Sequence, residues 1–199
     1  MRLFVALEIP EPPRRDLRRR VDAVRDRLPR ARWVDLDNLH LTLLFLGETA
    51  EGDVPALAAG LREAFARCPP LDLRLGSGGT FPPGRPARVA WIGVEAPEAL
   101  ATLQEDVTRA AVDALGFEPE ERAYHPHATL ARCPDPWRRE AIDKFKTALT
   151  GPVGPPFVAG HGVLFESKLS PKGARYRAVE TFPLIGKITG EMTGEEEEA

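Results

Sequence analysis

The chain repeats itself at an offset of 87 residues, and this duplication limits the folds that it can adopt. His40-Leu41-Thr42-Leu43 returns as His127-Ala128-Thr129-Leu130, and the register holds without a gap back to Glu8-Ile9-Pro10-Glu11 and Glu95-Ala96-Pro97-Glu98. Self-similarity at a fixed offset is typical of repeated structural units. The sequence therefore predicts two halves of one plan, at about residues 1–80 and 87–182.

Hydrophobic periodicity gives both halves the order β-α-β-α-β. Each half opens with a strand-like run, over 3–8 and 88–95, followed by helical spacing that ends before Pro29 or Gly116. The motif strand comes next, and then a second helix that begins near Pro55 in one half and near Pro136 in the other. Further strands are expected over 71–75, 157–165 and 176–182, and Gly/Pro-rich loops over 76–86 and 151–156.

The two halves are expected to share one core. The 199 residues suffice for one substantial core, and duplicated halves of this size usually pack together. We expect a single domain over 1–182. A disordered or loosely attached tail over 183–199 would follow, because this segment has little hydrophobic patterning and ends in an acidic run.

The acidic end of the chain masks the charge of the rest. The formal net charge is −3, but without Glu191 and Glu195 to Glu198 the chain has 27 basic residues against 25 acidic ones. This balance suits a phosphate-bearing ligand and is far from that of a strongly basic nucleic-acid coat. The sequence has no apolar run of membrane-spanning length, no signal peptide, and no metal-ligand spacing at Cys68 and Cys133, so we expect a cytoplasmic protein.

Each motif strand places an imidazole and a hydroxyl on one face. Because side chains alternate along a strand, His40 shares a face with Thr42, and His127 shares a face with Thr129. If a pseudo-two-fold axis relates the halves, the two pairs face each other across a cleft that suits a tetrahedral anion. One such motif alone would predict only a partly buried strand with a hydrogen-bonded histidine. Two copies in register, using two of four histidines, indicate a paired site.

A pair of histidines suits the cleavage of a phosphodiester by water. The reaction needs a base for the water and an acid for the leaving oxygen, and two imidazoles with a pKa near 6.5 can hold opposite protonation states near neutral pH. The threonine hydroxyls would donate to the non-bridging oxygens and hold the phosphorus in line. This chemistry requires no metal.

Together these motifs resemble the two-histidine phosphoesterase superfamily and, within it, the bacterial and archaeal RNA 2′,3′-cyclic phosphodiesterases first described as 2′-5′ RNA ligases. The resemblance spans about residues 1–182. It rests on Arg2-Leu3-Phe4-Val5-Ala6-Leu7, Asn38-Leu39-His40-Leu41-Thr42-Leu43 with Phe45-Leu46-Gly47, Arg88-Val89-Ala90-Trp91-Ile92-Gly93, His125-Pro126-His127-Ala128-Thr129-Leu130-Ala131-Arg132, and Glu166-Ser167 with Tyr176. It implies a bilobal α+β fold in which antiparallel sheets line a central cleft and helices lie outside.

The resemblance also implies an activity. Members of the family open the terminal 2′,3′-cyclic phosphate of RNA to a 2′-phosphate and a 3′-hydroxyl, without a cofactor, and the reverse 2′-5′ ligation is expected to be minor in water. His40 would be the proton donor and His127 the proton acceptor, with Thr42 and Thr129 as phosphate ligands. The expected partners are RNA ends or nucleoside 2′,3′-cyclic phosphates. The protein is expected to be a monomer that does not bind a membrane.

Three further residues correspond to positions at which family members contact the nucleoside. Phe45, expected on the face of His40, and Arg132 would stack on a base. Core packing is the alternative for Phe45, and a surface ion pair is the alternative for Arg132. Tyr124 takes a place where relatives often have Phe, which leaves open whether its ring packs or its hydroxyl forms a hydrogen bond.

Two other functions fit parts of the sequence. His125, His127 and His40 would give three imidazole ligands for zinc, although no carboxylate or cysteine is placed to complete the set and the threonines would have no role. An RNA-end-binding module without turnover is the second alternative. The aromatic content of 7% and the lack of a dense basic stripe disfavour it. His161 is predicted to be structural.

Overall fold

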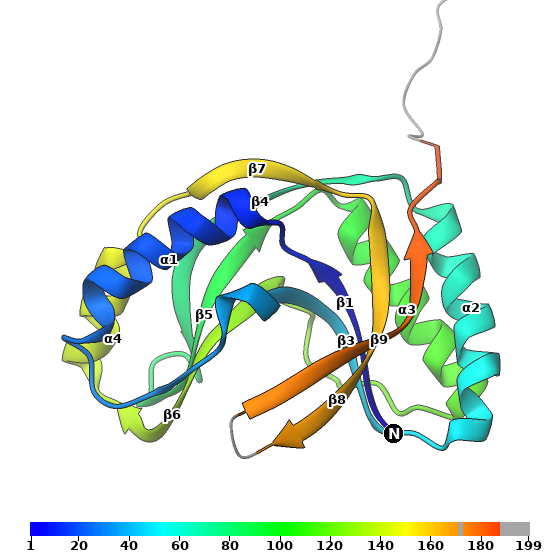
Figure 1. Ribbon diagram of the computed structural model, residues 1–199, viewed down its shortest axis with the longest axis horizontal. Coiled ribbons are helices and arrows are strands. Elements are labelled where there is room, and N and C mark those ends of the chain that lie inside the picture. Colours follow the sequence, from blue (N-terminus) through cyan, green and yellow to red (C-terminus); the bar gives the residue numbers. More distant parts are fainter. Residues whose placement is uncertain (171–172, 188–199) are drawn as a thin grey trace, which may run out of the picture.

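The computed structural model describes residues 1–170 and 173–187, which form helices and two antiparallel sheets. In chain order the elements are β1 (Arg2–Glu8), α1 (Glu11–Arg25), β2 (Arg32–Trp33), the 3-10 turn η1 (Leu36–Asn38), β3 (His40–Glu48), the 3-10 turn η2 (Glu51–Asp53), α2 (Val54–Arg67), β4 (Leu71–Phe81), β5 (Ala87–Glu95), α3 (Ala99–Leu115), β6 (His127–Trp137), α4 (Arg139–Ala148), β7 (Val153–Ala159), β8 (His161–Ser170) and β9 (Gly173–Pro183). The helices lie on the outer sides of the sheets (Figure 1). The predicted α+β class with antiparallel sheets is confirmed.

The order of the strands shows the duplication directly. One sheet runs β3-β1-β8-β9 and the other runs β2-β6-β5-β4-β7. Ignoring the short β2 at its edge, each sheet has the motif strand first, then the opening strand of the same half, and then a strand supplied by the other half. Thus β8 lies beside β1, and β4 lies beside β5.

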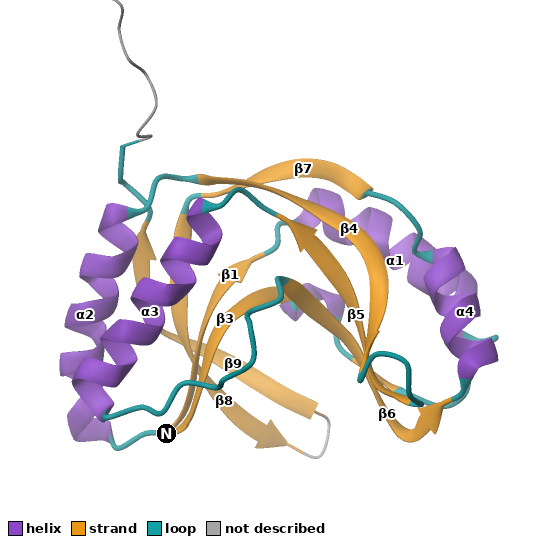
Figure 2. Ribbon diagram, turned by 180° about the vertical axis from the view of Figure 1, so that it is seen from behind, coloured by secondary structure: helices purple, strands orange, loops and turns teal. Residues whose placement is uncertain are grey.

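Each sheet forms one lobe together with the helices that pack beside it, and the helices are exchanged between the two lobes in the same way as the strands. α1 follows β1 of the four-stranded sheet but packs against β7 and α4 on the other lobe, whereas α2 packs against α3 (Figure 2). Leu17 and Val21 of α1 are buried, as are Leu103 and Val107 of α3. Each lobe therefore contains elements from both halves of the sequence, and neither lobe is built from one half alone.

The two stretches predicted to be Gly/Pro-rich loops are partly strands. β4 continues through the glycines to Phe81, and β7 begins at Val153. A Cβ atom at Gly79 would overlap the Trp91 ring, so the missing side chain lets this ring pack over the strand. Pro155 and Pro156 are tolerated because β7 is an edge strand.

The strand expected over 157–165 is two strands in different sheets. The chain leaves the five-stranded sheet after Ala159 and enters the four-stranded sheet at His161. A continuous apolar pattern carries no information about such a change of sheet. The strand expected over 176–182 is found in β9.

The packed chain extends beyond the predicted start of the tail at 183. Leu184 is buried and its N–H donates to the carbonyl of Gly160 at 2.9 Å, while the N–H of Gly186 donates to the carbonyl of Cys68 at 2.9 Å. These contacts correct the start of the tail. The remainder of the expected tail, 188–199, lies outside the described residues. Within the described ranges, no helix is both long and apolar enough to cross a membrane.

Candidate active site

The two motif strands come from different sheets and lie next to each other. β3 is the edge strand of its sheet, and it contacts β6 of the other. His40, Thr42, His127 and Thr129 are partly exposed, whereas Leu41 and Ala128 between them are fully buried. The alternation of faces that the motif predicts is therefore present in both strands, and the histidine and threonine of each motif lie on the side away from the core.

Both histidine rings are held in the same way. Nδ1 of His40 lies 2.8 Å from the carbonyl oxygen of Asn38, and Nδ1 of His127 lies 2.7 Å from the carbonyl oxygen of His125. A carbonyl oxygen only accepts hydrogen bonds, so Nδ1 carries the proton in each ring. Nε2 is then the nitrogen left to exchange protons with a ligand, in both halves of the repeat.

The charges around the two rings differ. Burial lowers the pKa of both imidazoles below 6.5, because it disfavours the charged form. The negative charge of Glu8 and the bond to Asn38 oppose this effect at His40. At His127 the bond to the carbonyl of His125 opposes it, but the charges of His125 and Arg122 lower the pKa further. The nearby charges thus act in opposite directions: Glu8 favours the protonated form of His40, whereas His125 and Arg122 favour the neutral form of His127.

Each histidine also packs against aromatic rings. The His40 ring lies 4.9 Å from Phe4 and 5.2 Å edge-on from Tyr176. The His127 ring lies 5.1 Å edge-on from Phe81 and 5.9 Å from Trp91. The sequence interpretation gave these aromatic residues no role in the site. The 87-residue offset could have found one pair of them, because it relates Phe4 to Trp91.

Each motif strand contains a bulge, which determines which later residues lie on the same face of the strand as the histidine (the histidine face). Ala6 pairs with Thr42 and Val5 with Leu44, so Leu43 is the extra residue in β3. In β6, Trp91 pairs with Thr129 and Ala90 with Ala131, so Leu130 is the extra residue. Since a bulge shifts the alternation by one residue, the next outward positions are Phe45 and Arg132. These two residues are themselves 87 apart.

The bulge explains why Phe45 lies on the face of His40. Strict alternation from residue 40 would place residue 45 on the opposite face, but Phe4 contacts both rings, at 4.9 Å from His40 and 5.5 Å from Phe45. Phe45 is 54% exposed, so core packing does not account for it. Arg132 is exposed, and the described residues include no acidic ion-pair partner for it.

Tyr124, in the loop before β6, links this loop to the first motif strand. Its hydroxyl donates to the carbonyl oxygen of Thr42 at 3.0 Å, and its ring packs partly buried against the core. Burial raises the pKa of this phenol far above its ordinary value of 10, so it stays protonated as a donor. The ring packs and the hydroxyl forms a hydrogen bond, and that hydrogen bond is made to the backbone of the first motif.

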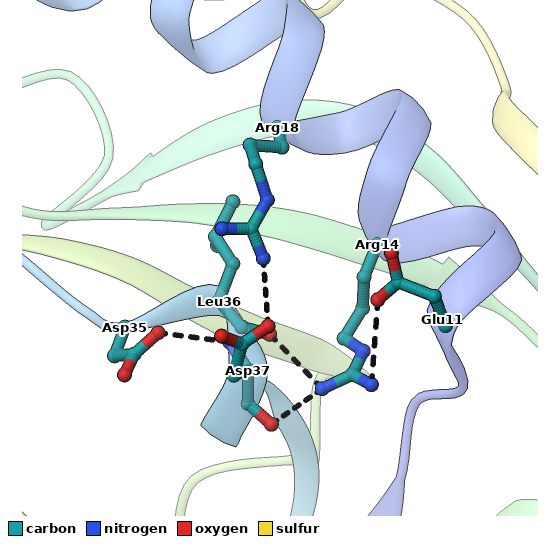
Figure 3. Close-up of polar contacts among 6 residues, drawn as sticks. All are labelled: Glu11, Arg14, Arg18, Asp35, Leu36 and Asp37. Atoms are coloured by element: carbon teal, nitrogen blue, oxygen red, sulfur yellow. Dashed lines mark hydrogen bonds and ion pairs between the residues drawn. The ribbon is translucent and has the colours of Figure 1, made fainter.

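Helix α1 fixes the segment that leads into His40 (Figure 3). Arg14 donates to the carbonyls of Leu36 and Asp37, and Arg18 pairs with the Asp37 carboxylate at 2.7 Å. The N–H of Asp37 in turn donates to the Asp35 carboxylate at 3.0 Å. These contacts hold the turn immediately before Asn38, whose carbonyl orients His40.

The zinc alternative finds no ligand set in the described part of the chain. No three or more His, Cys, Asp or Glu side chains gather there in a group that could hold a metal ion. His125 is exposed, with its ring 6.1 Å from the ring of His127. His161 lies at the start of β8 and its Nε2 is 3.1 Å from the Glu8 carboxylate.

Comparison with known proteins identifies the family of the chain. The sequence profile of the 2′-5′ RNA ligase superfamily matches residues 12–153. A protein of Methanothermobacter thermautotrophicus named RNA 2′,3′-cyclic phosphodiesterase is 30% identical over 92% of this chain and 99% of its own length. One of the same name from Thermus thermophilus is 35% identical over 94% of this chain and 92% of its own length.

Solved structures share the fold. TT0787 of Thermus thermophilus superposes with a TM-score of 0.80 at 31% identity, covering 94% of this chain and all of the other. E. coli LigT complexed with 3′-AMP superposes with a TM-score of 0.73 at 28% identity, covering 92% of this chain and 97% of the other. The resemblance seen in the sequence is thus confirmed, and the chain belongs to the 2′-5′ RNA ligase superfamily.

Proposed function

We propose that this protein is an RNA 2′,3′-cyclic phosphodiesterase that hydrolyses terminal cyclic phosphates to a 2′-phosphate and a 3′-hydroxyl without a metal ion. The observation that carries the proposal is the matched geometry of His40 and His127. Each has Nδ1 bound to the carbonyl two residues earlier and Nε2 left for proton exchange, on adjoining strands of the two halves. The names of the relatives support the same reaction.

The reaction uses the two rings in opposite states. Nε2 of neutral His127 takes a proton from water as the water oxygen bonds to phosphorus. The bond from phosphorus to the 3′-oxygen breaks, and Nε2–H of protonated His40 gives its proton to that oxygen. His127 ends the cycle protonated and His40 neutral, and exchange with solvent restores both. The opposite influences of Glu8 and Arg122 support this polarity.

The remaining roles follow from position. Thr42 and Thr129 would donate hydrogen bonds to the non-bridging oxygens and offset the charge that builds up there. Phe45, half exposed beside Phe4, would stack on the terminal base, and Arg132 would contact the same nucleotide. Tyr124 is assigned to holding β3 against β6 through its bond to Thr42. A 5′-hydroxyl in place of water would give the minor 2′-5′ ligation.

The proposal includes a cytoplasmic monomer that needs no cofactor. The two cysteines, Cys68 and Cys133, are both free and buried, which suits a reducing compartment. Burial raises the pKa of each thiol to about 11, so neither is a reactive thiolate. Gel filtration with light scattering would test the monomer.

Incubation of adenosine 2′,3′-cyclic phosphate with the protein in EDTA tests the reaction, with the products separated by chromatography. Formation of adenosine 2′-phosphate supports the proposal. Binding without turnover would favour the RNA-end-binding module, and loss of turnover in EDTA would favour the zinc enzyme. A 3′-phosphate product would show that the other phosphorus–oxygen bond breaks. His40→Ala serves as the control for contaminating nucleases.

A further inference from the structure

Two arginines lie side by side at the edge of the five-stranded sheet. Arg32 of β2 and Arg132 of β6 are Cα partners in an antiparallel pair. Directly opposed residues of such a pair point to the same face, with their Cβ atoms about 4.5–5.5 Å apart. Both side chains are exposed. Two guanidinium groups therefore start from neighbouring positions on one face.

This arrangement is unfavourable without an anion. Like charges directly opposed on neighbouring strands destabilise a sheet. In the described part of the chain, neither Arg32 nor Arg132 forms an ion pair with a carboxylate. Most arginines of α1 differ in this respect, since Arg14, Arg18, Arg19 and Arg25 all pair with acidic side chains. An oxyanion between the two forks would remove the repulsion, and a phosphate fits their geometry.

The arginine pair lies on the face that carries the histidines. Arg132 follows the bulge in β6 and points outward like His127 and Thr129. The next residue of β2, Trp33, points to the other face, where it packs near Trp137 and under Arg25 of α1. Arg132 also acts electrostatically on Tyr176, whose ring is edge-on to His40. The pair thus borders the proposed catalytic centre and does not belong to the helix layer.

The position of the pair along the strand separates its backbone from that of His127. Arg132 is five residues beyond His127, which corresponds to roughly 15 Å along a strand. A phosphate held by the two motifs would leave this position to another group of the substrate. The anion that an RNA chain offers there is the phosphodiester that joins the terminal nucleotide to the preceding one.

We propose that Arg32, together with Arg132, binds the phosphodiester on the 5′ side of the terminal nucleotide, which makes RNA chains better substrates than mononucleosides. This inference rests on the proposed function and adds to it a binding residue and a preference for RNA chains over mononucleosides. A nucleoside 2′,3′-cyclic phosphate has no phosphate at this place. A dinucleotide that ends in a 2′,3′-cyclic phosphate has one, so these two substrates isolate the contact.

Measurement of kcat/KM for both substrates with wild type and Arg32→Gln tests the inference. We expect Arg32→Gln to lower kcat/KM for the dinucleotide about 10-fold, the effect of one lost bond to a charged group, and to leave the mononucleoside unchanged. The loss should shrink as salt is added, because the contact is ionic. The matched control is Arg139→Gln, an exposed arginine on the outer helix α4, which should change neither value.

Two results would overturn the inference alone, and a third would overturn the proposed function with it. If Arg32→Gln lowers kcat/KM by the same factor for both substrates, or leaves kcat/KM for the dinucleotide unchanged, Arg32 does not bind this phosphodiester. In both cases the wild type still opens the cyclic phosphate, so the proposed function stands. If the wild type opens neither substrate, the proposed function fails and the inference fails with it.

Discussion

Glu8 is the Cα partner of His40 across the antiparallel pair β1–β3, and the two side chains lie on the same face. Phe4, four residues earlier in β1, also contacts His40, which places Glu8 on that side by alternation. Among residues 1–170 and 173–187, no carboxylate raises the pKa of His127 in this way, although Glu95 takes the place of Glu8 in the repeat. Glu8 is therefore one of the residues that distinguish the two halves of the site.

Glu8→Gln should move the basic limb of the pH dependence of kcat/KM to lower pH. Glu8 raises the pKa of His40, so its neutralisation lowers that pKa. An acid must be protonated to act, and activity is lost as the pH rises through its pKa. If His40 were instead the base, the same substitution would move the acidic limb to lower pH. Glu95→Gln is the control and should move neither limb.

Arg122→Met should move the acidic limb of the same profile to higher pH. The Arg122 guanidinium lies 4.6 Å from the centre of the Phe81 ring, which is edge-on to His127, and its charge lowers the pKa of His127. Without this charge the pKa of His127 rises, and a base is lost as the pH falls through its pKa. Arg139→Met on α4 should leave the profile unchanged. A shift of the basic limb would contradict the assignment of His127 as the base.

His40→Ala and His127→Ala should each lower kcat by about 10²- to 10⁴-fold, the usual contribution of a positioned acid or base. Thr42→Ala and Thr129→Ala should lower kcat less, because each removes about 1.5–3 kcal/mol of transition-state stabilisation, the value of a hydrogen bond to a charged group. All four side chains are partly exposed, so the melting temperature should stay close to that of the wild type. Full activity or unfolding of both histidine variants would refute these roles.

Tyr124→Phe should reduce the stability of the fold more than it reduces kcat. The substitution keeps the ring and removes only the bond to the Thr42 carbonyl, worth about 0.5–1.5 kcal/mol. For a chain of this size, a loss of about 1 kcal/mol corresponds to a fall in Tm of roughly 2–4 °C. Scanning calorimetry and kcat measured at 25 °C would show the two effects separately. A large loss of kcat with unchanged Tm would assign Tyr124 to the substrate instead.

The outward placement of both histidine–threonine pairs could be predicted from the repeat. The offset of 87 residues aligns His40 with His127 and Thr42 with Thr129, and alternation in a strand is enough to place each pair on one face. The exchange of α1 and α3 between the lobes was not predictable, because helical periodicity shows that a helix has a buried side but not which sheet covers it.

The features that the sequence predicted wrongly or did not reveal have local causes. Gly78 and Gly79 suggest a loop, but they are strand residues over which Leu149 and Trp91 pack. The bulges at Leu43 and Leu130 leave no mark in the composition, although they bring Phe45 and Arg132 onto the histidine face. The charges that separate the two histidines come from Glu8 and Arg122, which only the pairing of strands and the packing of loops bring near the rings.

A crystal structure of the protein with inorganic phosphate tests the paired site most directly. We expect one phosphate within hydrogen-bond distance of Nε2 of both His40 and His127 and of the hydroxyls of Thr42 and Thr129. Nδ1 of His40 should still donate to the carbonyl oxygen of Asn38, and Nδ1 of His127 to that of His125. A phosphate bound by only one motif, or rings whose Nε2 atoms point to separate regions of solvent, would contradict the paired site.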